Sequence, residues 1–377
     1  MIDDHRIIDA KATPIADVAA RLELTNLRRT GVELVGPCPQ CGGRDRFGIN
    51  TRTGLFQCRK DCGPHSKGDQ LALVQHCLGL DFRAALDWLC GPAQGLTDAE
   101  RAERRRKSED ARKRQQEIGR RERERTIAAA RRIWFSTLDA EGTAVRGYLD
   151  RRGISLALLP KLPISIRFAP EAKYLHPIAG ERGKYETLHV GPAMVCAIVD
   201  AANRVTAVHQ TWIDLDQPKG KLMLPDPSKP GEVLPSKKVL GSKKGCVIRL
   251  HNSRDATTLI MAEGVETTLS AMVAEHQPKA AYWCAVDLGN MAGRRETGPG
   301  KKFAGLPDMS DEDAFVPPSW VRRLVYVQDG DSDPRLTRAK LEAGLRRAMI
   351  RNPGLKGQIV HPGEGRDLND ILMGQNS

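Results

Sequence analysis

The 377-residue sequence has no apolar run long enough to cross a membrane, and its first ten residues carry acids where a secretory signal would be basic and then apolar. We therefore expect no membrane association and a cytoplasmic location. No segment fits the phosphate-binding pattern GxxxxGK followed by Ser or Thr, which argues against ATP-driven unwinding by this chain itself. Internal repeats are also lacking.

Acidic residues are fewer than basic ones: the sequence has 47 Asp and Glu and 59 Lys and Arg, which gives a formal net charge of +12. A surface with this excess attracts polyanions, so nucleic acid is the first candidate partner. At roughly 150 residues per domain, the length predicts two or three domains. The whole is expected to be an α/β multidomain protein.

Nine cysteines in a reducing compartment are not expected to form disulfides, and four of them have metal-ligand spacing. Cys38 and Cys41 form one close pair, and Cys58 and Cys62 form another after residues 42–57. Two such pairs typically hold one tetrahedral zinc ion, with His65 as the alternative to Cys62. Four protein ligands leave no open position on the metal, so we predict a structural zinc site in a small ribbon module.

The surface of this module is where we expect function. Cations for phosphates and aromatic rings for unstacked bases are mixed in the sequence around the cysteines, which suits single-stranded nucleic acid. One of the two aromatic rings is as well explained by core packing. The residues of this predicted binding surface are Arg44, Arg46, Phe47, Phe56, Arg59 and Lys60.

Helical periodicity appears on both sides of the cysteines. Residues 14–24 fit one short amphipathic helix, and residues 69–89 fit two helices interrupted near Gly79. Residues 100–132 are dominated by charged side chains and cannot build a core, so we predict a helical tether, either a solvated spacer or a nucleic-acid-binding arm.

Beyond the tether, apolar runs alternate with turn signals, and after Thr258 strands alternate with helices. This second pattern is typical of βαβ units and predicts a mostly parallel, Rossmann-like sheet. The predicted strands are 164–168, 193–199, 205–213, 246–250, 259–262, 324–328 and 358–361, and the predicted helices of the second part are 267–274 and 336–351.

Acidic residues follow two of these strands directly. In an open parallel sheet ligands bind at the carboxyl ends of strands, and several carboxylates at one place favour a hard divalent cation. We therefore predict a Mg²⁺ or Mn²⁺ site for phosphate chemistry. The simpler alternative for Asp329 to Asp333 is an ordinary acidic turn, with Pro334 opening the next helix, and Asp370 can be a cap. The candidate ligands are Glu263, Asp329, Asp331, Asp333 and Asp367.

Residues 259–373 resemble the Toprim domain shared by bacterial and phage primases, type IA and II topoisomerases and some nucleases. The resemblance rests on Glu263 after the first strand and on Asp329 and Asp331 after a later one. It implies that these three residues are catalytic. The family often has an Asp four residues after the Glu, where this chain has Thr267 preceded by Glu266.

The N-terminal part resembles the zinc modules of primases from phages and other mobile elements, including the Gly68-Asp69 step that opens a helix. Residues 131–255 resemble the basic half of a primase catalytic core. The implied organisation is a zinc module at 1–95, a linker at 96–130, this basic part, and a Toprim domain at 256–377. Lysines expected to hold template backbone and triphosphate are Lys219, Lys221, Lys237, Lys238, Lys243 and Lys244.

Together these patterns predict a DNA primase that joins nucleoside triphosphates into primers on single-stranded DNA, with a replicative helicase as partner. Two alternatives stay open. A Toprim nuclease uses the same acids, whereas a topoisomerase would need a tyrosine on a further large domain. A non-catalytic adaptor would bind single strands and recruit a helicase or polymerase, which the presence of three acidic sites argues against.

Overall fold

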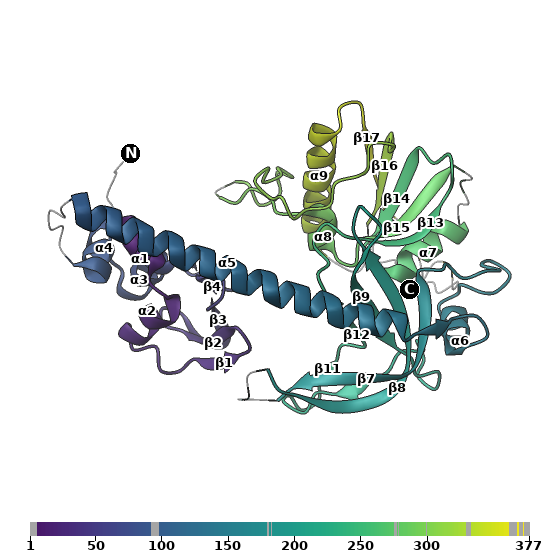
Figure 1. Cartoon of the computed structure of the whole chain (residues 1–377), viewed down its shortest axis with the longest axis horizontal. Helices are drawn as coiled ribbons and strands as arrows, with labels where there is room; N and C mark the ends of the chain where they lie inside the picture. The colour runs from purple at the N-terminus through teal and green to yellow at the C-terminus, as the bar shows by residue number, and fades with distance from the viewer. Residues whose placement is uncertain are drawn as a thin grey trace. The chain divides into compact units, whose positions relative to one another are not determined.

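A computed structural model describes residues 6–91, 98–178, 181, 183–274, 277, 279–298, 300–328, 333–361, 368 and 372. The chain divides into two compact units (Figure 1). Unit one comprises the residues up to Arg120 together with Leu175–Leu188, and unit two comprises Arg121–Tyr174 and the residues from His189 onward. No helix in the described ranges has the length and apolar character needed to span a membrane.

Unit one is built on an antiparallel five-stranded sheet whose strands follow one another in chain order. Phe47, Ile49 and Phe56 point from this sheet into the core, each at most 3% exposed. Strand β2 ends at the first cysteine and β4 ends at the third, so both metal-ligand pairs lie at turns. The strands are β1 (Arg28–Thr30), β2 (Glu33–Cys38), β3 (Gly42–Asn50), β4 (Leu55–Cys58) and β5 (Lys67–Gly68).

Four short helices complete the core of unit one: α1 (Arg6–Ala12), α2 (Ile15–Arg21), α3 (Gln70–Leu78) and α4 (Phe82–Cys90). The predicted break at Gly79 is confirmed. Gly79 ends α3 in the left-handed conformation at φ 67°, where a glycine lacks the steric cost of a side chain. Asp69 and Asp81 cap the N-termini of α3 and α4 through their carboxylates.

The charged tether is one helix, α5 (Asp98–Phe135), as its composition predicted. Its residues up to Arg120 belong to unit one and the rest to unit two. Near its end the sequence becomes apolar, and Ala130 packs with Val195 and Val208 in a small cluster. The C-terminal part of α5 is therefore anchored on a sheet of unit two, whereas the described side chains before it are mostly exposed.

The first sheet of unit two has the order β12-β9-β8-β7-β6. The helix α6 (Ala144–Arg151) and the face of β8 that carries Met194, Cys196 and Ile198 share one core. A separate small ladder joins β10 and β11. The strands are β6 (Leu138–Asp139), β7 (Ile166–Pro177), β8 (Tyr185–Val199), β9 (Val205–Trp212), β10 (Leu224–Pro225), β11 (Val233–Leu234) and β12 (Lys237–Gly241).

The second sheet of unit two has the order β13-β15-β14-β16-β17, and only the β13 edge is antiparallel. The prediction of a mostly parallel sheet is confirmed. The sheet begins earlier than residue 256, because β13 forms its edge. Its elements are β13 (Ile248–Asn252), β14 (Thr258–Ala262), α7 (Val265–Ala274), β15 (Ala280–Cys284), α8 (Leu288–Ala292), β16 (Arg323–Val327), α9 (Pro334–Arg351) and β17 (Lys356–Val360).

Both faces of this parallel sheet are covered, which explains why its strands are continuous apolar runs. Ile260 and Ala262 belong to the core that includes α6 and α7, whereas Leu259 and Met261 belong to a second core with α9. Alternate residues of β14 thus pack into the cores on opposite faces of the sheet. The sequence did not predict β15, which pairs in parallel with β14 and lies inside the sheet.

Candidate functional site

The four predicted zinc ligands come together in unit one. The sulfur atoms of Cys38, Cys41, Cys58 and Cys62 all lie within 4.8 Å of one another, and three pairs are 3.5–3.6 Å apart. Zn–S bonds of ~2.3 Å in a tetrahedron place sulfurs about 3.8 Å apart, whereas a disulfide needs about 2.05 Å. The cluster therefore fits a zinc ion and not a pair of disulfides.

Cys62 completes this cluster, and His65, the alternative fourth ligand, is not part of it. Arg46 supports the site from outside, with a guanidinium nitrogen 4.0 Å from the sulfur of Cys41. Burial would raise the pKa of Cys41, but hydrogen bonds involving Cys62 and Arg46 outweigh it and hold that pKa at about 7. Burial raises the pKa of Cys38 and of Cys62, so among these three cysteines Cys41 alone favours the thiolate form that zinc requires.

A histidine that the sequence analysis did not single out lies against the cluster. His76, on α3, places Nε2 3.2 Å from the sulfur of Cys38. Its ring stacks on Phe47 at an interplanar angle of 12° and contacts Phe56, and it is only 6% exposed. Its sequence signal was weak, because His76 lies 14 residues after Cys62, in the last turn of α3.

The burial of Phe47 and Phe56 corrects the expected role of these residues. They are 0% and 3% exposed and form the core beneath the cysteines, so neither ring offers a face to a base. The alternative of core packing applies to both rings and not to one. Arg44, Arg59 and Lys60 are exposed, so the accessible part of the predicted surface is cationic.

The first acidic strand end lies in the parallel sheet of unit two. Glu263 follows β14 and is half-buried. Met261 is paired in parallel with Tyr326 of β16, so two residues further along Glu263 is level with Gln328. Gln328 extends the β16 pairing by donating its backbone N–H to Val360 at 2.9 Å. Glu263 is thus aligned with the end of the strand that Asp329 follows in sequence.

Three of the predicted metal ligands, Asp329, Asp331 and Asp367, lie outside the described residues. Asp333 is described, and its Oδ1 accepts the backbone N–H groups of Arg335 and Leu336 at 3.1 Å each. It is therefore the N-cap of α9, with Pro334 in the first turn, as in the simpler alternative for this residue. A metal-binding role for Asp333 stays a prediction.

A buried ionic cluster lies just beyond Glu263, in the first turn of α7. Glu266 is 4% exposed, and its carboxylate accepts a hydrogen bond from the hydroxyl of Tyr148 on α6. Lys237 Nζ lies 2.8 Å from Glu266 Oε2, and Lys221 Nζ lies 3.4 Å from Oε1. Two of the predicted phosphate-binding lysines thus meet on one carboxylate.

The protonation states in this cluster follow from burial and charge. Burial would raise the pKa of Glu266, but Lys237 and Lys221 outweigh it and hold that pKa well below its usual value. Burial lowers the pKa of Lys221 to about 8 against the opposing attraction of Glu266. For Lys237 the attraction of Glu266 exceeds the burial cost, and its pKa is raised.

His209 on β9 adjoins this cluster and is fully buried. Burial, with a further contribution from Lys237, lowers its pKa to about 4, so the imidazole is neutral near pH 7. Within the described part of the chain its Nδ1 has no hydrogen-bond partner. The histidine therefore adds no positive charge to the two lysines.

The other predicted lysines are arranged differently. Lys238, next to Lys237 on β12, places its Nζ 3.6 Å from the ring centroid of Tyr174. Lys219 is exposed. Lys243 forms an ion pair of 2.6 Å with Asp287, and Lys244 pairs with Asp313. The six lysines thus do not form one continuous surface of equivalent cations.

Asp287 is a carboxylate at the sheet edge that the sequence analysis missed together with β15. It follows β15 by three positions and caps α8 by accepting the N–H of Asn290. Val286 before it has φ 76°, a left-handed conformation that is costly for a β-branched residue and typical of functional sites. The run Ala280–Cys284 was the available signal for a strand there.

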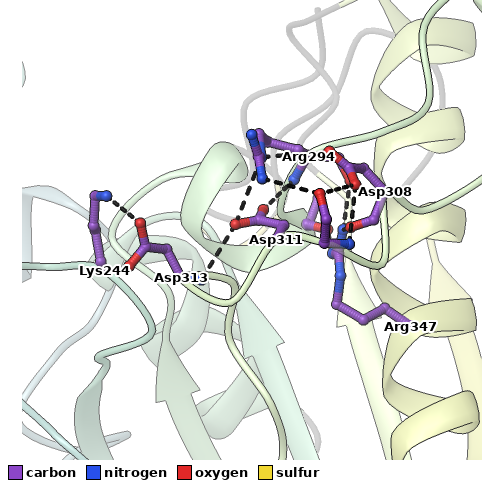
Figure 2. A network of polar contacts seen from close by, with 8 residues as sticks. Lys244, Arg294, Asp308, Asp311, Asp313 and Arg347 are labelled. Carbon is purple, nitrogen blue, oxygen red and sulfur yellow. Dashed lines mark hydrogen bonds and ion pairs between the residues drawn. The ribbon is translucent and has the colours of Figure 1, made fainter. Parts of the chain in front are cut away.

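A second polar network surrounds the loop that carries Asp308, Asp311 and Asp313 (Figure 2). The Arg294 side chain lies 3.6 Å from Asp308 and 3.7 Å from Asp311. Arg347 of α9 is 1% exposed and donates to the backbone carbonyl of Ala292. Arg347 also donates to the backbone carbonyl of Asp308 at 3.3 Å, and this contact ties the loop to α9.

Comparisons with known proteins identify relatives of limited similarity. A family model described as "Domain of unknown function (DUF7146)" matches residues 124–250. No curated protein matches the chain.

Among solved structures, a DNA primase domain from Pseudomonas aeruginosa is 14% identical, with 63% of this chain and 70% of that chain covered and a TM-score of 0.38. The RNA polymerase domain of the primase DnaG from Mycobacterium tuberculosis is 15% identical, with coverages of 66% and 79% and a TM-score of 0.33. The primase fragment of the bacteriophage T7 primase-helicase protein is 13% identical, with coverages of 90% and 94% and a TM-score of 0.31. These structural neighbours are primase domains.

Proposed function

We propose that the chain is a DNA primase that joins nucleoside triphosphates into short primers on single-stranded DNA. The observation that carries the proposal is that Glu263 and Glu266 both follow the C-terminal end of β14. Glu263 is a candidate metal ligand, and three residues later Glu266 gathers two lysines. Carboxylates for a divalent cation and ammonium groups for phosphates thus adjoin, as nucleotidyl transfer requires.

Residues 256–377 are proposed to be a Toprim-type domain. Glu263, Asp329 and Asp331, with Asp333 and Asp367 in support, would hold Mg²⁺ or Mn²⁺, which when bound supplies Lewis acidity and neutralises phosphate charge. The 3′-hydroxyl of one nucleotide gives its proton to solvent and attacks the α-phosphorus of the next. The new O–P bond forms as the bond from the α-phosphorus to the oxygen bridging to the β-phosphate breaks, and pyrophosphate leaves. Lys221 and Lys237 bind phosphate oxygens and orient the incoming triphosphate.

The cysteine module has a separate task in this proposal. Its zinc ion is structural, and the exposed cations around it bind the phosphates of the single-stranded template. Arg44, Arg59 and Lys60 carry this contact. A replicative helicase is the proposed partner, because the sequence has no phosphate-binding loop of its own for ATP-driven unwinding.

The direct test is primer synthesis by the purified full chain with single-stranded DNA, labelled nucleoside triphosphates and Mg²⁺ or Mn²⁺. The matched control is the double variant Asp329→Asn Asp331→Asn, which keeps side-chain size and removes two charges. Labelled oligomers from the wild type and none from the control support the proposal. Shortening of the template would favour a nuclease, and template binding without either product would favour the non-catalytic adaptor.

A further inference from the structure

The carboxylate of Glu266 is surrounded by more positive charge than it can neutralise. Lys221 and Lys237 contact it directly, and Arg152, at the end of α6, acts on the charge of both lysines. Two lysines thus share one carboxylate, and the charge of Arg152 acts on both of them. Tyr148 and His209 are neutral near pH 7. Burial is the main cause, because it raises the pKa of the phenol and lowers that of the imidazole. The cluster as a whole is positive.

Among the residues that the structure describes, the two lysines also keep part of their hydrogen-bonding capacity. Each ammonium has three N–H groups, and Glu266 takes one direct contact from each. Their side chains remain 23% exposed for Lys221 and 33% for Lys237, whereas that of Glu266 is 5% exposed. The carboxylate is therefore enclosed, and the lysine side chains are the part of the cluster that a ligand can reach.

The cluster joins segments that are far apart in the sequence. Tyr148 comes from α6, Lys237 from β12 and Glu266 from the first turn of α7. Two ammonium groups repel each other, and this repulsion would separate them without an anion between them. The position of both lysines beside the end of β14 therefore depends on the charge of Glu266.

We propose that Glu266 is a positioning residue that holds Lys221 and Lys237 together as a binding site for the polyphosphate part of a nucleotide, and that it is not a metal ligand. The identity of the ligand as a nucleotide rests on the proposed function. The binding of an anion by the two lysines does not. The two neighbouring acids then have different tasks: Glu263 binds the metal ion, and Glu266 positions the two lysines.

The test measures anion binding without metal or primer synthesis. The full chain is acetylated with an amine-reactive ester in the presence of increasing inorganic tripolyphosphate, and modification of Lys221 and Lys237 is quantified by mass spectrometry, with exposed Lys219 as the internal reference. In the wild type, tripolyphosphate protects Lys221 and Lys237. In Glu266→Gln we expect protection to need about tenfold more tripolyphosphate, as for a loss of one charge-assisted contact.

Tyr148→Phe is the matched control, because it removes a hydrogen bond to the same carboxylate without changing charge, and protection is expected to persist. If Glu266→Gln does not fold, as judged by circular dichroism, Lys237→Gln tests the same site through the protection of Lys221 and should reduce it. Equal protection in wild type and Glu266→Gln, or in wild type and Lys237→Gln, overturns the proposal.

Two further readouts separate positioning from other roles. Mn²⁺ binding followed by electron paramagnetic resonance should be retained in Glu266→Gln and weakened in Glu263→Gln; loss in both would make Glu266 a ligand and overturn the inference. In the primer assay, Glu266→Gln should raise the KM for nucleotide more than it lowers kcat. A wild type that shows protection but makes no primers would defeat the proposed function and leave the anion site standing.

Discussion

The ammonium of Lys237 lies 2.8 Å from Oε2 of Glu266 and joins the strand β12 to the first turn of α7. Lys237→Met should lower the free energy of unfolding of the chain by roughly 3 kcal/mol, because it removes a partner from a buried ion pair. Lys238→Met is the matched control on the same strand, with an expected loss of about 1 kcal/mol for its contact with the Tyr174 ring. Urea denaturation followed by tryptophan fluorescence measures both, and equal losses would contradict the assigned difference.

The reactivity of Lys221 should depend on pH with a midpoint near 8. Burial lowers the pKa of Lys221 to about 8, Glu266 on α7 opposes this shift, and Lys237 on β12 and Arg152 add to it. The amine is therefore charged and protected from acylation below pH 8, and becomes nucleophilic as pH rises through that value. Tripolyphosphate binding should weaken over the same range.

In Glu266→Gln the midpoint should shift to lower pH, because the attraction that favours the charged amine is lost. Acetylation rates of Lys221 between pH 6 and 10, normalised to Lys219, provide the measurement. An unchanged midpoint in this variant would show that Glu266 does not set the charge of Lys221.

Removing zinc should unfold unit one. The four thiolates are brought together at turns of a small sheet, and an apparent binding free energy of about 10–16 kcal/mol is typical of such structural sites at pH 7. We expect one zinc per chain by a colorimetric chelator assay, and loss of circular dichroism signal from the module on chelation. Cys58→Ser should lose the metal, whereas Cys90→Ser, outside the cluster, should keep it.

Zinc affinity should also depend on His76. Its Nε2 lies 3.2 Å from the sulfur of Cys38, where an N–H donor would stabilise the thiolate. His76→Phe keeps an aromatic ring against Phe47 and Phe56 and removes the donor, so we expect zinc binding about tenfold weaker, as is typical of outer-sphere partners. Competition with a fluorescent zinc chelator measures this, and unchanged affinity would assign His76 to packing alone.

Asp333 offers a test of capping against metal binding. Asp333→Asn retains a side-chain oxygen for the N–H groups of Arg335 and Leu336, whereas Asp333→Ala loses it at a cost of about 1 kcal/mol. If the cap is the main role, Asp333→Asn keeps stability and primer synthesis. Loss of synthesis in Asp333→Asn, with unchanged thermal unfolding, would make Asp333 a metal ligand.

Features of the structure that depend on a short stretch of sequence were predicted correctly. The cysteine spacing gave all four members of the sulfur cluster, and Gly79 between two apolar periods gave the break between α3 and α4. The apolar runs before Glu263 and Asp329 predicted β14 and β16, because strands buried on both faces show an uninterrupted hydrophobic pattern.

What the sequence did not predict depends on contacts between distant segments. Lys221, Lys237 and Glu266 each look like surface charges locally, and their union arises only when α7 packs beside β12. Phe47 follows Arg46 and Phe56 lies three residues before Arg59, which suggested a stacking surface, but strand alternation turns both rings inward. The strand β15 was missed because its five residues are as compatible with a buried helix.

Helices and the neighbouring sheet close both sides of the β13–β17 layer, so a substrate has no route to Glu263 through the flat surfaces of that layer. In the proposed function, selectivity then depends on the connections that follow β14, β15 and β16, together with Lys221 and Lys237. Exchanging these connections should therefore change which substrate is accepted. The strand residues that keep the protein folded would stay the same.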